Sequence, residues 1–337
     1  MLKNLLIAAV LGVFAMMLNG CNAASKGERG DRFAIVIHGG AGVLSKTAPP
    51  ADVAAYEASL ARALSKGRDH LASGGTSLDA VELVVRELED NPLFNAGKGA
   101  VFTAEGKHEL DASIMNGSNL ACGAIAGVTT VKNPISLARL VMQNTKHVLL
   151  AAAGAERFAT EQKVERVENS YFDTERRRKS FEEWKNEQAS TVPGYTYGTV
   201  GCVALDKKGN LAAATSTGGM TGKRWGRVGD APIVGAGTYA NNESCAISCT
   251  GTGEEFIRHG VARAISDRML LAGESLKTAS DHLVFKTLKT DDGGLIGVSK
   301  TGKMVMPYNS EGMFRGMADS SGRFEIGIWG EVKTVKP

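Results

Sequence analysis

Thr199 lies where the residue composition of the sequence changes most abruptly. A heavily charged stretch, 156–188, leads to Gly198, and the apolar run that follows is typical of a buried strand. A charged segment that ends on glycine is a natural place for chain cleavage. Cleavage there would give Thr199 a free α-amine, which could act as general base for the hydroxyl of the same residue. The boundary predicts the precursor of an N-terminal-threonine hydrolase; the alternative is a loop-to-strand junction without chemistry.

A second hydroxyl is expected beside Thr199. The polar turn 206–210 separates two apolar runs, and if Leu205 pairs with Leu211, Thr199 lies opposite Thr217. Their Cβ atoms would then be about 5 Å apart, within reach of a hydrogen bond between the hydroxyls. The alternative is an ordinary cross-strand threonine pair.

Arg227 and Asp230 lie three residues apart beyond a glycine-rich loop. Opposite charges at this spacing could bind the α-carboxylate and the α-ammonium of a free amino acid. The alternative is a surface salt bridge between the two.

The run Ser248-Cys-Thr-Gly-Thr-Gly253 follows an apolar strand and precedes a predicted helix. Backbone N–H groups at such a helix entry could stabilise an oxyanion. Thr252 and Glu255 have the spacing of a capping box, so a helix cap without chemistry is the alternative.

Other binding functions are not supported. The net charge of +3 is too small to indicate a nucleic-acid partner. Gly235–Ala240 matches a dinucleotide-binding pattern but is followed by a predicted strand, and Gly218–Lys223 lacks the spacer of a phosphate-binding loop. No cysteine or histidine spacing suggests zinc. Cys122, Cys202, Cys245 and Cys249 are expected to be small buried thiols.

Periodicity predicts the elements that position these residues. Helices are expected at 51–72, from Thr76 to Asn91, after Pro134, at 253–271 and at 275–289. Strands are expected at 33–37, 100–103, 108–114, 121–131, 199–205, 211–217, 233–239, 244–249, 295–299, 303–307 and 324–329. The charged stretch is expected to be partly helical and peripheral. Two sheets with helices outside them fit this order.

The N-terminus is predicted to be a targeting segment. Lys3 precedes an apolar stretch, 5–18, that is too short for a confident membrane span. Cys21 then follows a small residue, as in bacterial lipoprotein signals, so residues 1–21 are expected to be the signal and 22–31 a tether. An ordinary secretory signal is the alternative. Either predicts an exported protein, periplasmic or on the outer membrane.

Taken together, the motifs resemble the plant-type asparaginase and isoaspartyl peptidase family of N-terminal nucleophile hydrolases, from about residue 32 to 330. They are His38–Gly42, Pro92–Gly97, Gly198–Gly201, Ser216–Gly219, Gly226–Asp230 and Cys249–Gly253. The resemblance implies an α+β fold, a four-layer αββα sandwich formed by one domain, 32–337. It also implies self-cleavage into an α chain, 32–198, with a charged linker at about 156–198, and a β chain, 199–337. Two of each would form the mature unit, a dimer of αβ units.

The resemblance implies roles for individual residues. Thr199 matches the nucleophile and Thr217 its supporting hydroxyl. Arg227 matches the residue that binds the substrate α-carboxylate, and Asp230 the one that binds its α-amine. A substrate limited in this way is an Asp-like unit, as in asparagine or a β-aspartyl dipeptide.

Supporting positions are matched as well. Thr250 and Gly251 match the oxyanion-hole donors, and Asn95 a residue that positions the nucleophile region. His38 is expected to orient the glycine loop Gly39-Gly40. No cofactor is implied for catalysis. In bacterial members a loop holds sodium through backbone carbonyls, and the matching positions are Leu88, Glu89, Asn91, Phe94, Ala96 and Lys98.

Two other functions stay open at this point. A glycosylasparaginase would act on N-glycosyl asparagine, although such enzymes usually carry Asp where this chain has Gly198. An uncleaved, lipid-anchored protein could instead bind β-aspartyl peptides through Arg227 and Asp230 without hydrolysing them.

Overall fold

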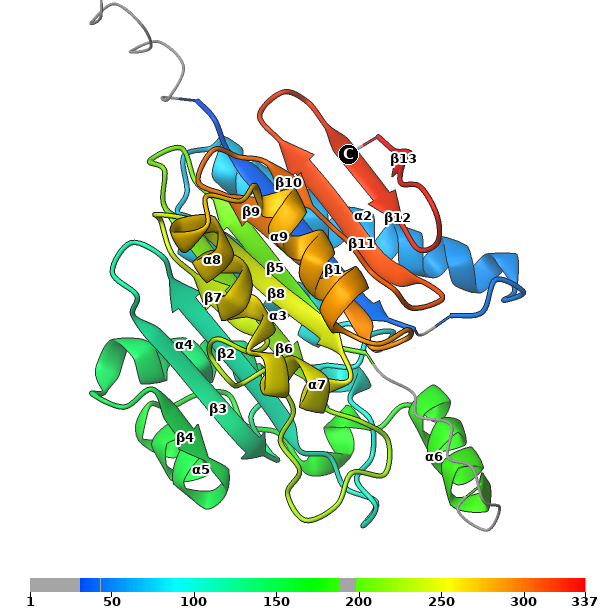
Figure 1. The fold of residues 1–337 in the computed structure, drawn as a ribbon. Coiled ribbons are helices and arrows are strands. Elements are labelled where there is room, and N and C mark those ends of the chain that lie inside the picture. The colour runs from blue at the N-terminus through cyan, green and yellow to red at the C-terminus, as the bar shows by residue number, and fades with distance from the viewer. Residues whose placement is uncertain (1–30, 43, 188–197, 337) are drawn as a thin grey trace, which may run out of the picture.

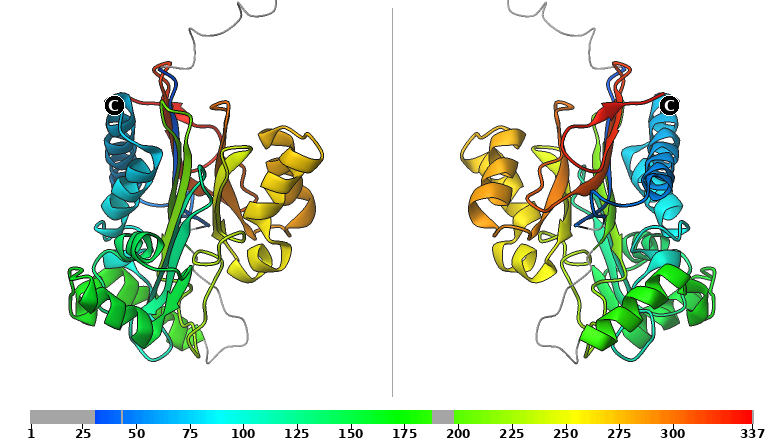
Figure 2. Two further views of the ribbon diagram at one scale, coloured as in Figure 1. Left: turned by 90° about the vertical axis from the view of Figure 1, so that its left-hand side faces the viewer. Right: turned by 90° about the vertical axis from the view of Figure 1, so that its right-hand side faces the viewer.

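The computed structural model describes residues 31–42, 44–187 and 198–336. They form four layers, with helices on the outside and two sheets face to face between them (Figures 1 and 2). The expected αββα arrangement of an α+β fold is confirmed. Cys21 and the expected signal lie outside the described residues, as does nearly all of the expected tether.

Nine of the described strands form the larger sheet. Across the sheet they are β13 (Lys333–Thr334), β12 (Phe324–Gly327), β11 (Met313–Asp319), β1 (Ala34–Ala41), β5 (Val200–Leu205), β6 (Leu211–Thr217), β2 (Leu110–Asn116), β3 (Cys122–Val128) and β4 (Leu149–Ala151). Neighbours are antiparallel except β3 and β4, which are parallel.

The smaller sheet contains four of the described strands. In order they are β10 (Met304–Val305), β9 (Gly293–Ser299), β8 (Cys245–Gly251) and β7 (Thr238–Ala240). All pairs are antiparallel. β8 ends at Gly251, so the expected oxyanion motif lies at the end of a central strand.

The helices cover the two outer faces. On the larger sheet lie α2 (Pro50–Ala72), α3 (Ser77–Glu89), α4 (Pro134–Asn144) and α5 (Ala152–Glu161); on the smaller sheet lie α7 (Gly253–His259), α8 (Val261–Leu271) and α9 (Leu276–His282). α6 (Glu175–Glu187) projects from the body (Figure 1). Short helical turns occur at Gly97–Gly99, Asn169–Phe172 and Leu283–Thr287.

Two hydrophobic cores follow from this layering. Ile35 and Ile37 of β1 face the core under α2 and α3, whereas Ala34 and Val36 face the core between the sheets. Alternation of this kind is what a strand buried on both faces requires.

The β5–β6 hairpin has the predicted register. Leu205 pairs with Leu211, and Val200 pairs with Ser216. Asp206 fixes the turn because its carboxylate accepts hydrogen bonds from the backbone N–H groups of Lys208 and Asn210, both at 2.9 Å. The predicted placement of Thr199 opposite Thr217 therefore holds.

Several expected elements differ in extent. Residues 100–103 contain no strand beyond an isolated bridge at Thr103, and the strand expected at 233–239 is reduced to β7. The helix expected at 253–271 is divided at Gly260, which has φ of +53°. The capping box is wrong, because Thr252 makes no side-chain cap hydrogen bond. β11, which pairs with β1, was not expected.

The four cysteines that the structure describes are unpaired thiols. Cys202, Cys245 and Cys249 are buried, whereas Cys122 is only partly so. Burial raises the pKa of each, that of Cys245 to about 12. Among the described helices, none is long and apolar enough to cross a membrane.

Candidate active site

Thr199 is buried at the start of β5, still joined to Gly198. Its hydroxyl donates to Oγ1 of Thr217 at 3.1 Å, and that hydroxyl donates to the carbonyl oxygen of Gly198 at 3.1 Å. The backbone N–H of Gly219 in turn donates to Thr217 at 3.0 Å. The candidate nucleophile and the carbonyl that precedes it are thus linked through one side chain.

Asn95 is the second donor to the Gly198 carbonyl. Its Nδ2 lies 2.8 Å from that oxygen and 2.7 Å from the carbonyl oxygen of Gly219, while its Oδ1 accepts from Val101 N at 3.0 Å. The Gly198 oxygen therefore accepts two hydrogen bonds. This arrangement would stabilise negative charge on the oxygen if the carbonyl carbon were attacked.

His38 holds the other side of Thr199. Its Nδ1 lies 2.9 Å from the Thr199 carbonyl oxygen, which can only accept, so Nδ1 carries the hydrogen. Nε2 then accepts from Ser248 Oγ at 2.9 Å, and Ser248 is linked to Thr215 at 2.7 Å. Burial lowers the pKa of His38 to about 3, so the ring is neutral. Sequence reasoning missed this hydroxyl network, since its members come from three strands.

Two glycines let the backbone come close. Gly40 has φ of +113°, and a Cβ there would lie 2.9 Å from Cα of Gly198. A Cβ on Gly39 would lie 2.4 Å from the ring of Phe94. The expected glycine loop is therefore packed directly against the residue that precedes the nucleophile.

A small polar cleft opens beside Thr199. Arg227, Asp230 and Gly251 line it together with Thr217, Gly198, Gly219, Met220 and Gly229. Its open volume is about 10 Å³, the room of one water molecule. An amino acid would not fit there until Gly198 moves.

Arg227 and Asp230 both reach this cleft but do not pair with each other. Arg227 donates through Nε and Nη2 to Glu254, both at 2.8 Å, so the expected alternative of an Arg227–Asp230 salt bridge is wrong. The sequence analysis did not predict Glu254 as the partner of Arg227, although Glu254 lies in the first turn of α7, four residues beyond Thr250. The Glu254 side chain is 40% exposed, so solvent reaches the carboxylate that pairs with Arg227.

Asp230 is buried, and within the described residues its Oδ2 has no hydrogen-bond partner. Burial raises the pKa of Asp230 to about 7, against the opposing effect of Arg227. A buried carboxylate oxygen without a donor is costly, so it favours an added cation such as an ammonium group.

Of the two expected oxyanion-hole residues, Gly251 lines the cleft and Thr250 is buried. Gly251 lines the cleft with φ of +148°, and a Cβ there would lie 1.9 Å from the carbonyl oxygen of Asp292. Thr250 is fully buried, and its Oγ1 accepts from Ala41 N at 3.2 Å. Accepting this bond leaves the hydroxyl hydrogen for another acceptor.

The buried aspartate predicts a pH dependence in the uncut chain. The pKa of Asp230 is about 7 when folded and about 3.8 when unfolded, so folding favours its protonated form. The contribution of Asp230 to the free energy of unfolding is fully present below pH 4 and is lost as the pH rises to 7. In a Thr199→Ala background, the free energy of unfolding should fall by up to about 4 kcal/mol over this pH range, and Asp230→Asn should remove that fall.

Urea unfolding between pH 4 and 8 measures this effect. Asp69→Asn, which removes an exposed carboxylate on α2, serves as the matched control. Parallel profiles for Asp230→Asn and its parent would contradict the prediction.

Comparisons with known proteins show the family of this chain. The family described as asparaginase matches residues 31–328. A probable isoaspartyl peptidase/L-asparaginase 2 of Arabidopsis thaliana is 43% identical over 323 residues, covering 88% of this chain and 99% of the relative. The isoaspartyl peptidase of Escherichia coli (strain K12) is 44% identical, with 88% and 96% covered. The isoaspartyl peptidase/L-asparaginase of Homo sapiens is 42% identical, with 87% and 95% covered. The chain therefore belongs to the asparaginase family.

Proposed function

We propose that this protein is a self-processing threonine amidohydrolase that acts on β-aspartyl dipeptides and L-asparagine. The observation that carries the proposal is the chain of hydrogen bonds from the Thr199 hydroxyl through Thr217 to the Gly198 carbonyl. The relatives named isoaspartyl peptidase or L-asparaginase support the same activity.

Self-cleavage is the first reaction. Oγ of Thr199 attacks the carbonyl carbon of Gly198, and Asn95 and Thr217 donate to the oxygen that becomes negative. The C–N bond breaks, the nitrogen takes up the proton that Oγ has lost, and an ester joins the Gly198 carbonyl carbon to Oγ of Thr199. Water then hydrolyses the ester, which leaves a carboxylate on Gly198 and a free amine on Thr199.

Substrate hydrolysis reuses the same hydroxyl. The new α-amine takes the Oγ proton while Oγ attacks the side-chain carbonyl carbon of the substrate. Thr250 and Gly251 are the proposed donors to the oxyanion. The leaving amine takes the proton and departs, and water hydrolyses the aspartyl ester to L-aspartate. Nucleophile and base both come from one residue, so no cofactor is needed.

The charges of the cleft define the substrate class. Asp230 offers its unpartnered Oδ2 to an α-ammonium group, and Arg227 binds the α-carboxylate when Glu254 withdraws. A substrate must then have both α groups free and a β-carbonyl that reaches Thr199. Asparagine and β-aspartyl dipeptides meet this condition.

We propose a structural sodium ion in the loop after α3, as the family resemblance implies. The backbone of this loop is tightly packed, since a Cβ on Gly97 would lie 2.3 Å from the Glu89 carbonyl oxygen and one on Gly99 would lie 2.1 Å from that of Phe94. Hard oxygen ligands of this kind suit an alkali cation. The full set would be the carbonyls of Leu88, Glu89, Asn91, Phe94, Ala96 and Lys98, with a structural role only.

Assembly and location complete the proposal. A dimer of αβ units is proposed for the mature protein. The leader and Cys21 support export and a lipid anchor, with the folded body held at the membrane by the tether.

Self-cleavage predicts a simple mass change. Wild-type chain should separate into two fragments, the second beginning at Thr199, whereas Thr199→Ala should stay intact because it lacks the attacking hydroxyl. Thr199→Ser keeps a hydroxyl and should still cut. Intact-mass spectrometry during incubation measures this, and a Thr199→Ala chain that cuts at the same bond would refute the autocatalytic step. A wild-type chain that never cuts would favour the binding protein.

Substrate choice is tested by assaying asparagine, β-Asp-Leu and an N-glycosyl asparagine together. The first two should be hydrolysed, and Asp230→Asn should lower kcat/KM for both by 100-fold or more, since the ammonium loses its buried charged partner. Activity on the glycosylated substrate alone would favour a glycosylasparaginase.

Anchoring is tested with Cys21→Ser. The variant should lose partitioning into detergent and keep hydrolysis by the processed enzyme. Membrane partitioning that survives the substitution, or wild-type protein found free in the periplasm, would contradict the lipid anchor.

A further inference from the structure

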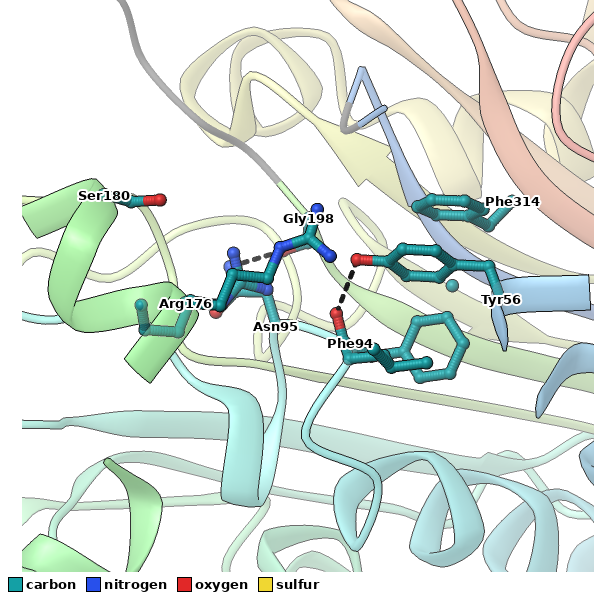
Figure 3. Close-up of a pocket in the computed structure, with 10 residues that line it drawn as sticks. Tyr56, Phe94, Asn95, Arg176, Ser180, Gly198 and Phe314 are labelled. Carbon is teal, nitrogen blue, oxygen red and sulfur yellow. Dashed lines mark hydrogen bonds between the residues drawn. The ribbon is translucent and has the colours of Figure 1, made fainter. Parts of the chain in front are cut away.

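A second cavity lies behind the scissile bond. It has a volume of about 130 Å³, and its lining includes Gly198, Asn95, Tyr56, Arg176 and Arg177. Figure 3 shows Arg176 of α6 reaching toward Gly198 and Tyr56. The guanidinium carbon of Arg176 is 5.2 Å from the centre of the Tyr56 ring.

The cavity carries unbalanced positive charge. Arg177 is only 6% exposed, and its Nε donates to the Gly99 carbonyl oxygen at 2.6 Å. Burial lowers the pKa of Arg177 to about 10, so it is charged at neutral pH. Among the residues that the structure describes, no carboxylate forms a salt bridge with Arg176 or Arg177. A buried cation without an anion is costly, so a site of this kind favours an added anion.

Gly198 lines both this cavity and the cleft beside Thr199. Its carbonyl oxygen is already held by Asn95, which also lines the cavity. Cleavage would turn this carbonyl into a carboxylate at the boundary between the two spaces. A carboxylate that stayed in the cleft would occupy the volume that a substrate needs.

We propose that this cavity is the binding site for the C-terminal carboxylate of Gly198. Arg176 and Arg177 are its counterions, and Asn95 continues to donate a hydrogen bond to it. The inference rests on the proposed self-cleavage, which supplies the carboxylate. Binding there removes the new chain end from the cleft and opens it to substrate.

The two arginines do not depend on the cut for their position. On the same helix, Phe181 stacks against Phe102 with ring centres 5.1 Å apart, and Trp184 stacks against Phe181 at 5.7 Å. Arg177 is bonded to Gly99 in the body of the protein. α6 therefore stays docked after cleavage and keeps both cations beside Gly198.

The test uses the mature, self-processed enzyme. Arg176→Gln removes an exposed cation from the cavity, Arg176→Lys keeps the charge, and Lys179→Gln removes an exposed cation elsewhere on α6 as the matched control. Two properties are measured: removal of Gly198 by a carboxypeptidase, followed by mass spectrometry, and steady-state hydrolysis of β-Asp-Leu.

Arg176→Gln should self-cleave fully but lose Gly198 to the carboxypeptidase at least fivefold faster. Its KM should rise at least threefold with kcat within twofold, because the released chain end competes with substrate. Trimming the chain end should return KM to the wild-type value. For Arg176→Lys, the rate of Gly198 removal and the KM should lie between those of Arg176→Gln and the wild type. For Lys179→Gln, both should equal the wild-type values.

Three outcomes would overturn the site. One is an Arg176→Gln enzyme whose rate of Gly198 removal and KM both equal those of the wild type. Another is a raised KM that trimming does not restore. The third is failure of Arg176→Gln to self-cleave while the wild type does, which would assign the arginine to the cutting step. A wild-type chain that stays intact would instead contradict the proposed function itself, and intact mass shows this before any variant is compared.

Discussion

The pairing of β5 with β6 is the constraint on which the site depends. With Leu205 opposite Leu211, the strands deliver Thr199 and Thr217 to the same point at the end of the hairpin. A slip of one residue would turn one hydroxyl to the other face of the sheet. Asp206 prevents this by fixing the turn through two backbone N–H groups. A carboxylate at the far end of the hairpin thus sets the geometry of the candidate nucleophile.

Close backbone approach is the second requirement. Because Gly40 has no Cβ, the backbone of Gly198 can pack against it. Gly201 leaves room for the His38–Ser248 hydrogen bond. A Cβ on Gly201 would lie 2.1 Å from Ser248 Oγ and 2.3 Å from His38 Nε2. Gly40 and Gly201 thus each permit a close contact on which the surroundings of Thr199 depend.

The sequence allowed prediction of what depends on local pattern. The hairpin, the helix opened by Thr76 and the gathering of Arg227, Asp230 and Gly251 near Thr199 follow from spacing and from the family resemblance. Pairing across long separations could not be predicted: β11 lies beside β1 almost 280 residues away in sequence. The same reason hid Glu254 as the partner of Arg227, because a salt bridge depends on how α7 docks and not on its own composition.

The uncut chain holds charges that lack a counterpart among its described residues. Asp230 presents a buried oxygen without a donor on one side of Gly198, and Arg177 presents a buried cation on the other. Each is costly in the precursor. The proposed reactions supply the missing partners, an ammonium group from the substrate and a carboxylate from the cut chain. Stability given up before cleavage would then be recovered as binding energy, so the precursor is organised for the mature enzyme more than for its own lowest free energy.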